Sequence, residues 1–178
     1  RRGAVKYSDY AVGRFIERAR SKPWFNDTMF VVVADHCASV AGRTELPVRD
    51  YRIPLFFYAP GMVKPGRVER LISQIDIAPT ILQALGVAGD DNFFGKAFYD
   101  QSGPSRAFIS NYQNLGYYKE GQLIVLKPKR RVEAFRVDPV SLESTPTSPD
   151  GALVEEAIAY YQTASRAFKL GKLELIWK

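Results

Sequence analysis

The sequence predicts an α/β fold, and three features point to it. Thr28 to Ala34, reading TMFVVVA, is continuously apolar and rich in β-branched residues, and a second apolar run covers Ile53 to Tyr58. Such runs are typical of strands buried on both faces, as in parallel sheets. In the second half of the chain, short alternating segments precede a long amphipathic helix from Ala152 to Leu170. We therefore expect an α/β core, then a small antiparallel sheet and a C-terminal helix.

The chain begins with an amphipathic segment. Apolar residues recur at helical spacing from Tyr7 to Ala19, and Ser8-Asp9 can cap this helix. We expect it to end before Pro23. After the first apolar run, the segment from Cys37 to Arg52 has no periodic pattern. Loops of this length inside a compact domain are often functional.

A shorter helix is predicted from Asp76 to Leu85. Asp76 is expected to cap its start, Pro79 falls in the first turn where its missing N–H costs little, and Gly86 can end the helix.

The second half of the chain is predicted to form short strands, with turns at Gly121 and Pro128 and a loop from Thr145 to Gly151. The predicted strands are Arg106 to Ser110, Gly116 to Lys119, Gln122 to Lys127 and Val132 to Val137. We interpret residues 1–100 as the α/β core and residues 101–178 as the antiparallel sheet with the C-terminal helix, both within the same domain.

The composition is that of a soluble globular protein with a basic surface. The formal net charge is +6, and the densest basic cluster, from Lys127 to Arg131, surrounds a turn signal at Pro128. We interpret this cluster as a hairpin tip and not as a nucleic-acid site. The single cysteine excludes an internal disulfide. Neither a membrane span nor a signal peptide is apparent, and the chain opens without a methionine, so we expect a piece of a longer protein.

Asp35-His36 is the strongest candidate for chemistry. His36 is the only histidine, and the pair directly follows the first apolar run, where α/β proteins place their ligand sites. A carboxylate with an imidazole suits Zn²⁺ or Mn²⁺, and the carboxylate also suits Ca²⁺. The alternative is that Asp35 forms part of a turn and His36 is a surface residue. Two ligands do not complete a metal site, so others must come from elsewhere.

Several segments resemble the sulfatase-like branch of the alkaline phosphatase superfamily. In chain order they are Asn26 to His36 (NDTMFVVVADH), Ile53-Pro54-Leu55 with Ala59-Pro60-Gly61, Gln74 to Leu82 (QIDIAPTIL), Phe93 to Lys96 (FFGK) and Ala157 to Ser165 (AIAYYQTAS). The last of these is most similar to lipoteichoic acid synthases and phosphoglycerol transferases, and less so to arylsulfatases. The resemblance implies the C-terminal portion of an alkaline-phosphatase-like domain.

The resemblance also implies roles for particular residues. Asp35 and His36 match the family's adjacent Asp and His, which bind the catalytic divalent metal; its identity (Mn, Zn, Ca or Mg) stays open. The family's nucleophile is a Thr, or a modified Cys in true sulfatases, and lies upstream together with further ligands. We therefore expect no catalytic nucleophile here, and no such role for Cys37. Arg43 is a candidate for binding an anionic group, and Glu45 for supporting the site.

The expected function of the intact protein is metal-dependent transfer of a phosphoglycerol-type group, or hydrolysis of phosphate or sulfate esters of envelope lipids or glycans. An arylsulfatase is the alternative, and a non-catalytic fragment with the same fold is another. The resemblance implies the N-terminal half of the same protein as partner. It also implies a location outside the cytoplasmic membrane, with attachment through an upstream segment. We expect the 178 residues alone to be inactive.

Overall fold

A computed structural model describes residues 2–37, 45–87, 93–99 and 105–173. The chain divides into two compact units. The first consists of Arg1–Asp35 and Ile53–Arg67, and the second of His36–Arg52 and Val68–Lys178. The predicted division near residue 100 stays a prediction.

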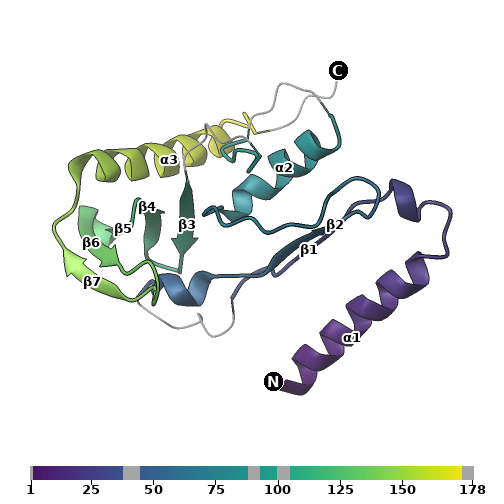
Figure 1. Ribbon diagram of the computed structural model, residues 1–178. Coiled ribbons are helices and arrows are strands. Elements are labelled where there is room, and N and C mark those ends of the chain that lie inside the picture. The colour runs from purple at the N-terminus through teal and green to yellow at the C-terminus, as the bar shows by residue number, and fades with distance from the viewer. Residues whose placement is uncertain (1, 38–44, 88–92, 100–104, 174–178) are drawn as a thin grey trace. The chain divides into compact units, whose positions relative to one another are not determined.

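The first unit contains an α-helix, a short 3₁₀ helix at Phe25–Asp27 and a two-stranded sheet (Figure 1). Helix α1 spans Arg2–Ala19, strand β1 spans Phe30–Val33 and strand β2 spans Leu55–Tyr58. The helix prediction is confirmed, but its start is not: Ser8 and Asp9 lie inside α1 and do not cap it.

Strands β1 and β2 form where the apolar runs predict them but pair antiparallel, with Phe30 opposite Tyr58 and Val33 opposite Leu55. The expectation that each run forms a strand buried on both faces, as in a parallel sheet, is therefore wrong for these two strands. A parallel crossover normally uses a helix. The described part of their connection contains a 3₁₀ helix at Val48–Tyr51 and no α-helix. In the described sheet, β1 and β2 have only each other as neighbours. The side chain of Phe56 on β2 is therefore 63% exposed.

An aromatic cluster around Phe30 holds the first unit together. The Phe15 ring of α1 meets the Phe30 ring edge-on, with centroids 5.9 Å apart. Phe25, Trp24 and Tyr58 also contact Phe30, at centroid distances of 5.6, 6.4 and 6.2 Å. Aromatic pairs in this range stabilise beyond the area they bury. This packing fixes the start of β1, and so the direction in which the strand approaches Asp35.

The second unit contains a five-stranded antiparallel sheet with strand order β3-β4-β5-β6-β7. The strands are β3 (Arg106–Ser110), β4 (Leu115–Lys119), β5 (Gln122–Lys127), β6 (Arg131–Val137) and β7 (Ser144–Thr147). The first four confirm the prediction to within one residue. Gly121, at φ +73°, makes the predicted turn, and the basic cluster is indeed a hairpin tip, with a 3₁₀ helix at Pro128–Arg130.

Strand β7 corrects the prediction of a loop beginning at Thr145. This segment carries Pro146, which cannot donate a ladder hydrogen bond, so the sequence argues against a strand. In the structure β7 lies at the edge of the sheet, with Pro146 opposite Phe135. An edge strand accepts proline because one of its sides needs no hydrogen bonds.

Helix α3 (Gly151–Lys169) lies along one face of this sheet, as Figure 1 shows. Asp150 caps it by accepting hydrogen bonds from the backbone N–H groups of Ala152 and Leu153. Successive residues of β5 alternate between two cores. Ile124 packs beneath α3 in a core that consists of Tyr117, Ile124, Ala134, Leu153 and Ala157. The other face forms a core from Leu46, Ile109, Leu123, Val125 and Val137.

Helix α2 (Ile77–Ala84) follows a 3₁₀ helix at Gln74–Asp76, and together they confirm the predicted short helix. Gly86 ends it in the left-handed conformation, with φ +67°. Within the described ranges, no helix combines the length and apolarity needed to span a bilayer.

Candidate metal centre

Asp35 and His36 lie one residue beyond the end of β1, close to the strand end as predicted, and both are exposed. Asp35 is the last residue of its stretch of the first unit, and His36 is the first residue of the second unit. The backbone N–H of Ala34 donates to the carbonyl of Pro54 at 3.3 Å, which extends the pairing of β1 with the chain before β2 up to the residue before Asp35. The strand pairing therefore continues up to the residue before Asp35.

One hydrogen bond defines the tautomer of His36. Its Nδ1 lies 2.8 Å from the carbonyl oxygen of Cys37. A carbonyl oxygen only accepts hydrogen bonds, so Nδ1 must carry the hydrogen, and in the neutral ring Nε2 carries the lone pair. Metal-binding histidines are commonly oriented in this way, with the second ring nitrogen donating to a carbonyl. The arrangement fits His36 as a metal ligand through Nε2.

The donor types of the pair also fit a divalent metal. A carboxylate oxygen and an imidazole nitrogen suit Zn²⁺ or Mn²⁺. Among the residues that the structure describes, no group of three or more His, Cys, Asp or Glu side chains could hold a metal. Because Zn²⁺ takes about four ligands and Ca²⁺ six or more, the pair can supply only part of a site.

The other candidates contribute less. Arg43 lies outside the described residues. Glu45 is exposed, whereas the next residue, Leu46, is buried in the core of the sheet and anchors the segment that follows Asp35-His36. Cys37 is partly buried, with a free thiol. Tyr51 fixes the same segment, since its hydroxyl donates to the carbonyl of Ser110 at 3.1 Å.

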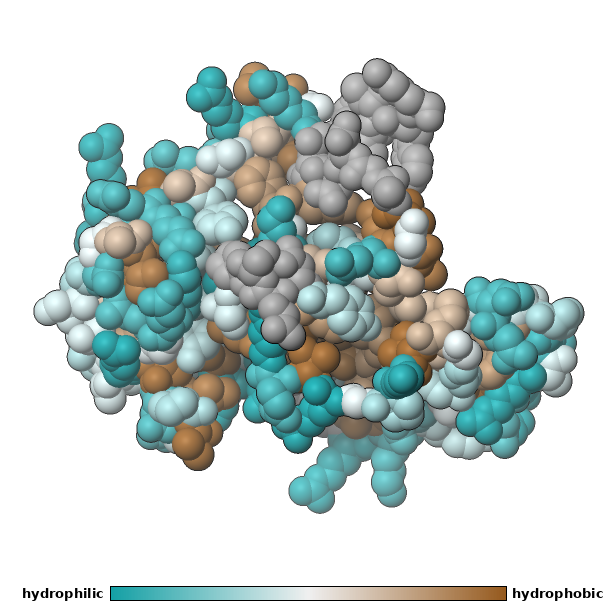
Figure 2. Space-filling model, turned by 45° about the horizontal axis from the view of Figure 1, so that its top comes forward, coloured by the Kyte–Doolittle hydropathy of each residue, from teal (hydrophilic) through white to brown (hydrophobic). Residues whose placement is uncertain are grey.

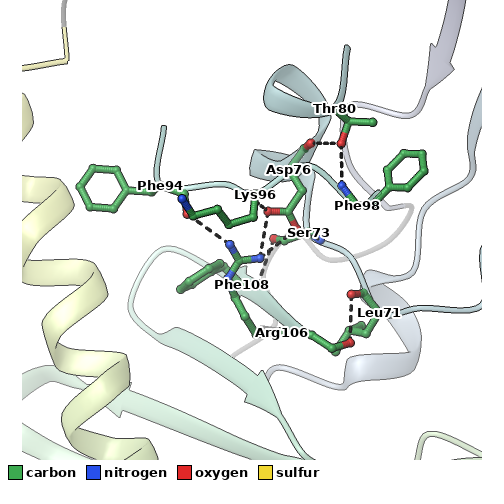
Figure 3. Close-up of polar contacts among 10 residues, drawn as sticks. Leu71, Ser73, Asp76, Thr80, Phe94, Lys96, Phe98, Arg106 and Phe108 are labelled. Atoms are coloured by element: carbon green, nitrogen blue, oxygen red, sulfur yellow. Dashed lines mark hydrogen bonds and ion pairs between the residues drawn. The ribbon is translucent and has the colours of Figure 1, made fainter. Parts of the chain in front are cut away.

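A buried polar cluster of the second unit centres on Asp76 (Figure 3). Its carboxylate accepts the backbone N–H groups of Ser73 and Lys96, each at 2.8 Å. The Arg106 guanidinium donates to both carboxylate oxygens, at 2.8 and 3.0 Å. Ser73 and Asp76 form a reciprocal capping box. The prediction that Asp76 caps the helix with its own side chain is therefore wrong: Asp76 makes no side-chain cap hydrogen bond to α2, and Ser73 is the N-cap of the capping box, with Asp76 as its third residue. The Asp76 carboxylate instead joins three segments of the chain.

Arg106 was missed as a polar partner, because in the sequence it is only the first residue of a strand. It is 1% exposed and donates also to the carbonyl of Phe94, at 3.2 Å. Its guanidinium carbon lies 5.2 Å from the centre of the Phe108 ring and 5.7 Å from that of Tyr160. Burial alone would lower the pKa of Arg106, but the hydrogen bonds and charge of Asp76 raise it. The residue therefore stays charged and pins strand β3 to the start of α2.

Gly95 allows this cluster to close. A Cβ atom at this position would lie 1.9 Å from the carbonyl oxygen of Ile75, which is backbone and has little room to move. Gly95→Ala should therefore lower the free energy of unfolding by roughly 1–3 kcal/mol, the usual cost of overpacking. Urea unfolding followed by circular dichroism measures this change. Gly66→Ala is the control, because a Cβ there meets nothing within 4 Å; equal losses in both variants would contradict the explanation.

Comparison with known proteins first defines the class. A crystal structure of a protein in the alkaline phosphatase superfamily from Vibrio parahaemolyticus matches 97% of this chain with a TM-score of 0.89 and 31% identity, and the match covers 42% of that protein. The chain thus has a fold of the alkaline phosphatase superfamily, as the sequence predicts.

The family follows from the sequence matches. The Sulfatase family model matches residues 1–87, the part that contains Asp35 and His36. Phosphoglycerol transferase I from Salmonella arizonae is 29% identical over 139 residues. Lipoteichoic acid synthase 2 from Bacillus subtilis is 30% identical over 102 residues, and an arylsulfatase from Clostridium perfringens is 24% identical over 140. These matches confirm the resemblance to the sulfatase-like branch of the alkaline phosphatase superfamily. The family model itself matches residues 1–87.

These matches cover unequal shares of the proteins. They include 76% of this chain for the transferase, 49% for the synthase and 71% for the arylsulfatase. The chain itself spans only 18% of the length of the transferase, 16% of the synthase and 29% of the arylsulfatase.

Proposed function

We propose that the intact protein is a metal-dependent enzyme that transfers a phosphoglycerol-type group, or hydrolyses phosphate or sulfate esters, on lipids or glycans of the cell envelope. The observation that carries the proposal is the position of Asp35-His36, one residue beyond β1 and within the stretch that matches the Sulfatase family model. The phosphoglycerol transferase and lipoteichoic acid synthase relatives support the transferase reaction.

In this proposal the chain holds the metal through the Asp35 carboxylate and Nε2 of His36. The hydrogen bond from Nδ1 to the Cys37 carbonyl keeps the imidazole in the required tautomer. A bound divalent metal stabilises the negative charge that develops on the transferring group. The nucleophile and the remaining ligands belong to the N-terminal half. A guanidinium at Arg43 would suit a bidentate contact to a phosphate or sulfate group.

The proposed partner of this chain is the N-terminal half of the same protein. Helix α1 supports this, because the apolar residues Val5, Tyr7, Tyr10 and Phe15 are 67%, 72%, 62% and 56% exposed. Four large apolar side chains exposed on one helix are typical of a surface that another part of a protein covers. We further propose that the domain works outside the cytoplasmic membrane, attached through an upstream segment.

An arylsulfatase is the second candidate, favoured by the relative from Clostridium perfringens. The upstream sequence discriminates between the two. A Cys-x-Pro-x-Arg motif would favour the sulfatase, and a Thr in that place the phosphotransferase. A non-catalytic fragment with the same fold is the description we propose for the 178 residues taken alone.

The isolated chain should therefore show negligible turnover, because two ligands without a nucleophile do not make an active site. Hydrolysis of p-nitrophenyl phosphate, bis-p-nitrophenyl phosphate and p-nitrophenyl sulfate, each with added Mn²⁺ or Zn²⁺, measures this, with the complete protein as positive control. Robust metal-dependent turnover by the isolated chain that disappears in Asp35→Ala would refute the prediction.

A further inference from the structure

A groove runs along the C-terminal half of α3, beside the ends of β4 and β5. Its volume is about 630 Å³, and its lining consists of four apolar or aromatic side chains from the sheet and helix (Leu115, Leu126, Ile158 and Tyr161), Leu170, the polar Gln162 and Ser165, and the basic Arg166 and Lys169. Leu115 and Leu126 lie opposite each other on neighbouring strands and form an apolar wall. Tyr161 has its polar end satisfied, because its hydroxyl donates to the carbonyl of Gly116 at 2.9 Å. The interior of the groove is therefore suited to hydrocarbon.

The rim of the groove is cationic. Residues 157–173 include Arg166, Lys169 and Lys172 and no Asp or Glu. Neither Arg166 nor Lys169 makes an ion pair with a carboxylate within the described ranges. The acidic residue Glu156, nearer the start of α3, is already held by Lys119 at 2.8 Å. Along the part of the helix that borders the groove, from residue 157 onward, the charged side chains are thus all positive.

Large apolar side chains accompany these cations at the end of α3. Phe168 is 76% exposed, Leu170 56% and Leu173 39%. Figure 2 shows that apolar residues reach the molecular surface in patches between hydrophilic ones. The negative end of the helix dipole accounts for Arg166 and Lys169 at a helix C-terminus, but it does not account for exposed Phe168 and Leu170. Basic residues mixed with exposed aromatic and aliphatic ones are typical of segments that lie on anionic membranes.

We infer that this groove binds an anionic phospholipid of a bilayer, with Leu115, Leu126 and Ile158 facing its hydrocarbon and Arg166 and Lys169 facing its phosphate. The surface would hold the domain against the membrane whose lipids are the proposed substrates. Such binding needs neither the metal nor turnover. The inference therefore stands or fails independently of the proposed function.

Co-flotation of the chain with vesicles tests this inference. Vesicles of phosphatidylglycerol mixed with phosphatidylcholine should bind the chain roughly tenfold or more better than phosphatidylcholine alone, since each cation near an anionic surface contributes to affinity. The double variant Arg166→Glu/Lys169→Glu should lose most of this difference, and higher salt should weaken binding of the unchanged chain. Leu170→Ser should weaken it too, because Leu170 lines the groove.

The matched control is Lys129→Glu/Arg130→Glu, which makes the same charge change at the exposed tip between β5 and β6. Circular dichroism melting verifies that each variant is folded. The inference is overturned if the control variant loses as much binding as the α3 variant, because the net charge of the chain alone would then explain the binding. Equal binding to both kinds of vesicle also overturns it. A third result would also overturn it: the chain sediments as a dimer, the α3 variant dissociates that dimer, and no lipid binding is seen. The groove would then be a dimer contact.

Discussion

Replacing Asp76 with alanine should lower the free energy of unfolding by roughly 3–5 kcal/mol, the cost of leaving one member of a buried ion pair without its partner. Arg106 is 1% exposed and would lose its only carboxylate among the described residues. The backbone N–H groups of Ser73 and Lys96 would lose their acceptor as well. Because domains are typically stable by about 5–15 kcal/mol, the variant should be at or near the limit of folding. Urea unfolding followed by circular dichroism measures the loss.

Two variants show whether the ion pair causes this loss. Asp138 also accepts two backbone N–H groups, from Val140 and Ser141, but is exposed. Asp138→Ala should therefore cost much less. Arg106→Met leaves Asp76 with its two backbone donors, so its cost should fall between those of the other two. A loss below about 1 kcal/mol in Asp76→Ala would contradict a buried pair.

The exposed carboxylate of Asp138 also predicts the direction in which the stability of the fold changes with pH. Hydrogen bonds from the backbone of Ser141 and Val140 lower the pKa of Asp138. A group whose pKa is lowered by folding stabilises the fold above its unfolded pKa, and the contribution is lost as the pH falls through the folded pKa. The stability difference between the unchanged chain and Asp138→Ala should accordingly shrink in acid.

The second large effect concerns catalysis by the complete protein. His36→Ala and Asp35→Ala should each reduce kcat/KM by roughly 100-fold or more, because even residues that only support metal ligands commonly contribute 10–100-fold. Activity with a phosphoglycerol-bearing lipid, assayed at several metal concentrations, measures this. Excess metal should restore part of the activity if the remaining ligands still bind weakly.

Asp27→Ala is the matched control for these variants. Asp27 is an exposed carboxylate at the other end of the same strand, just before β1. Its removal should leave kcat/KM within about threefold of the unchanged protein, since exposed substitutions away from a site rarely have large effects. Equal losses in Asp27→Ala and Asp35→Ala would point to a damaged strand and not to a lost ligand.

Local patterns in the sequence predicted much of the second unit. Strands β3 to β6 and helix α3 follow from alternation, helical periodicity and the turn signals at Gly121 and Pro128. Strand β7 was missed because Pro146 weakens the local signal, and only its edge position explains it. The antiparallel pairing of β1 with β2 was missed because an apolar run indicates burial but not the direction of a neighbour.

As with the fold, the sequence predicted those parts of the candidate site that a local pattern marks and missed those that depend on distant residues. Asp35 and His36 could be found from the sequence because a polar pair directly after an apolar strand is a local pattern. The Asp76–Arg106 pair joins residues 30 positions apart, so the local sequence marked Asp76 only as a residue at a helix start. The tautomer of His36 depends on a backbone carbonyl that no residue type reveals.

Metal analysis of the complete protein tests the central claim most directly. We predict about one equivalent of divalent metal per chain, with anomalous scattering within about 2.0–2.2 Å of the Asp35 carboxylate and of His36 Nε2. The metal should be lost from His36→Ala but kept by Asp27→Ala. A metal bound elsewhere, or retained in full by both Asp35→Ala and His36→Ala, would contradict the account.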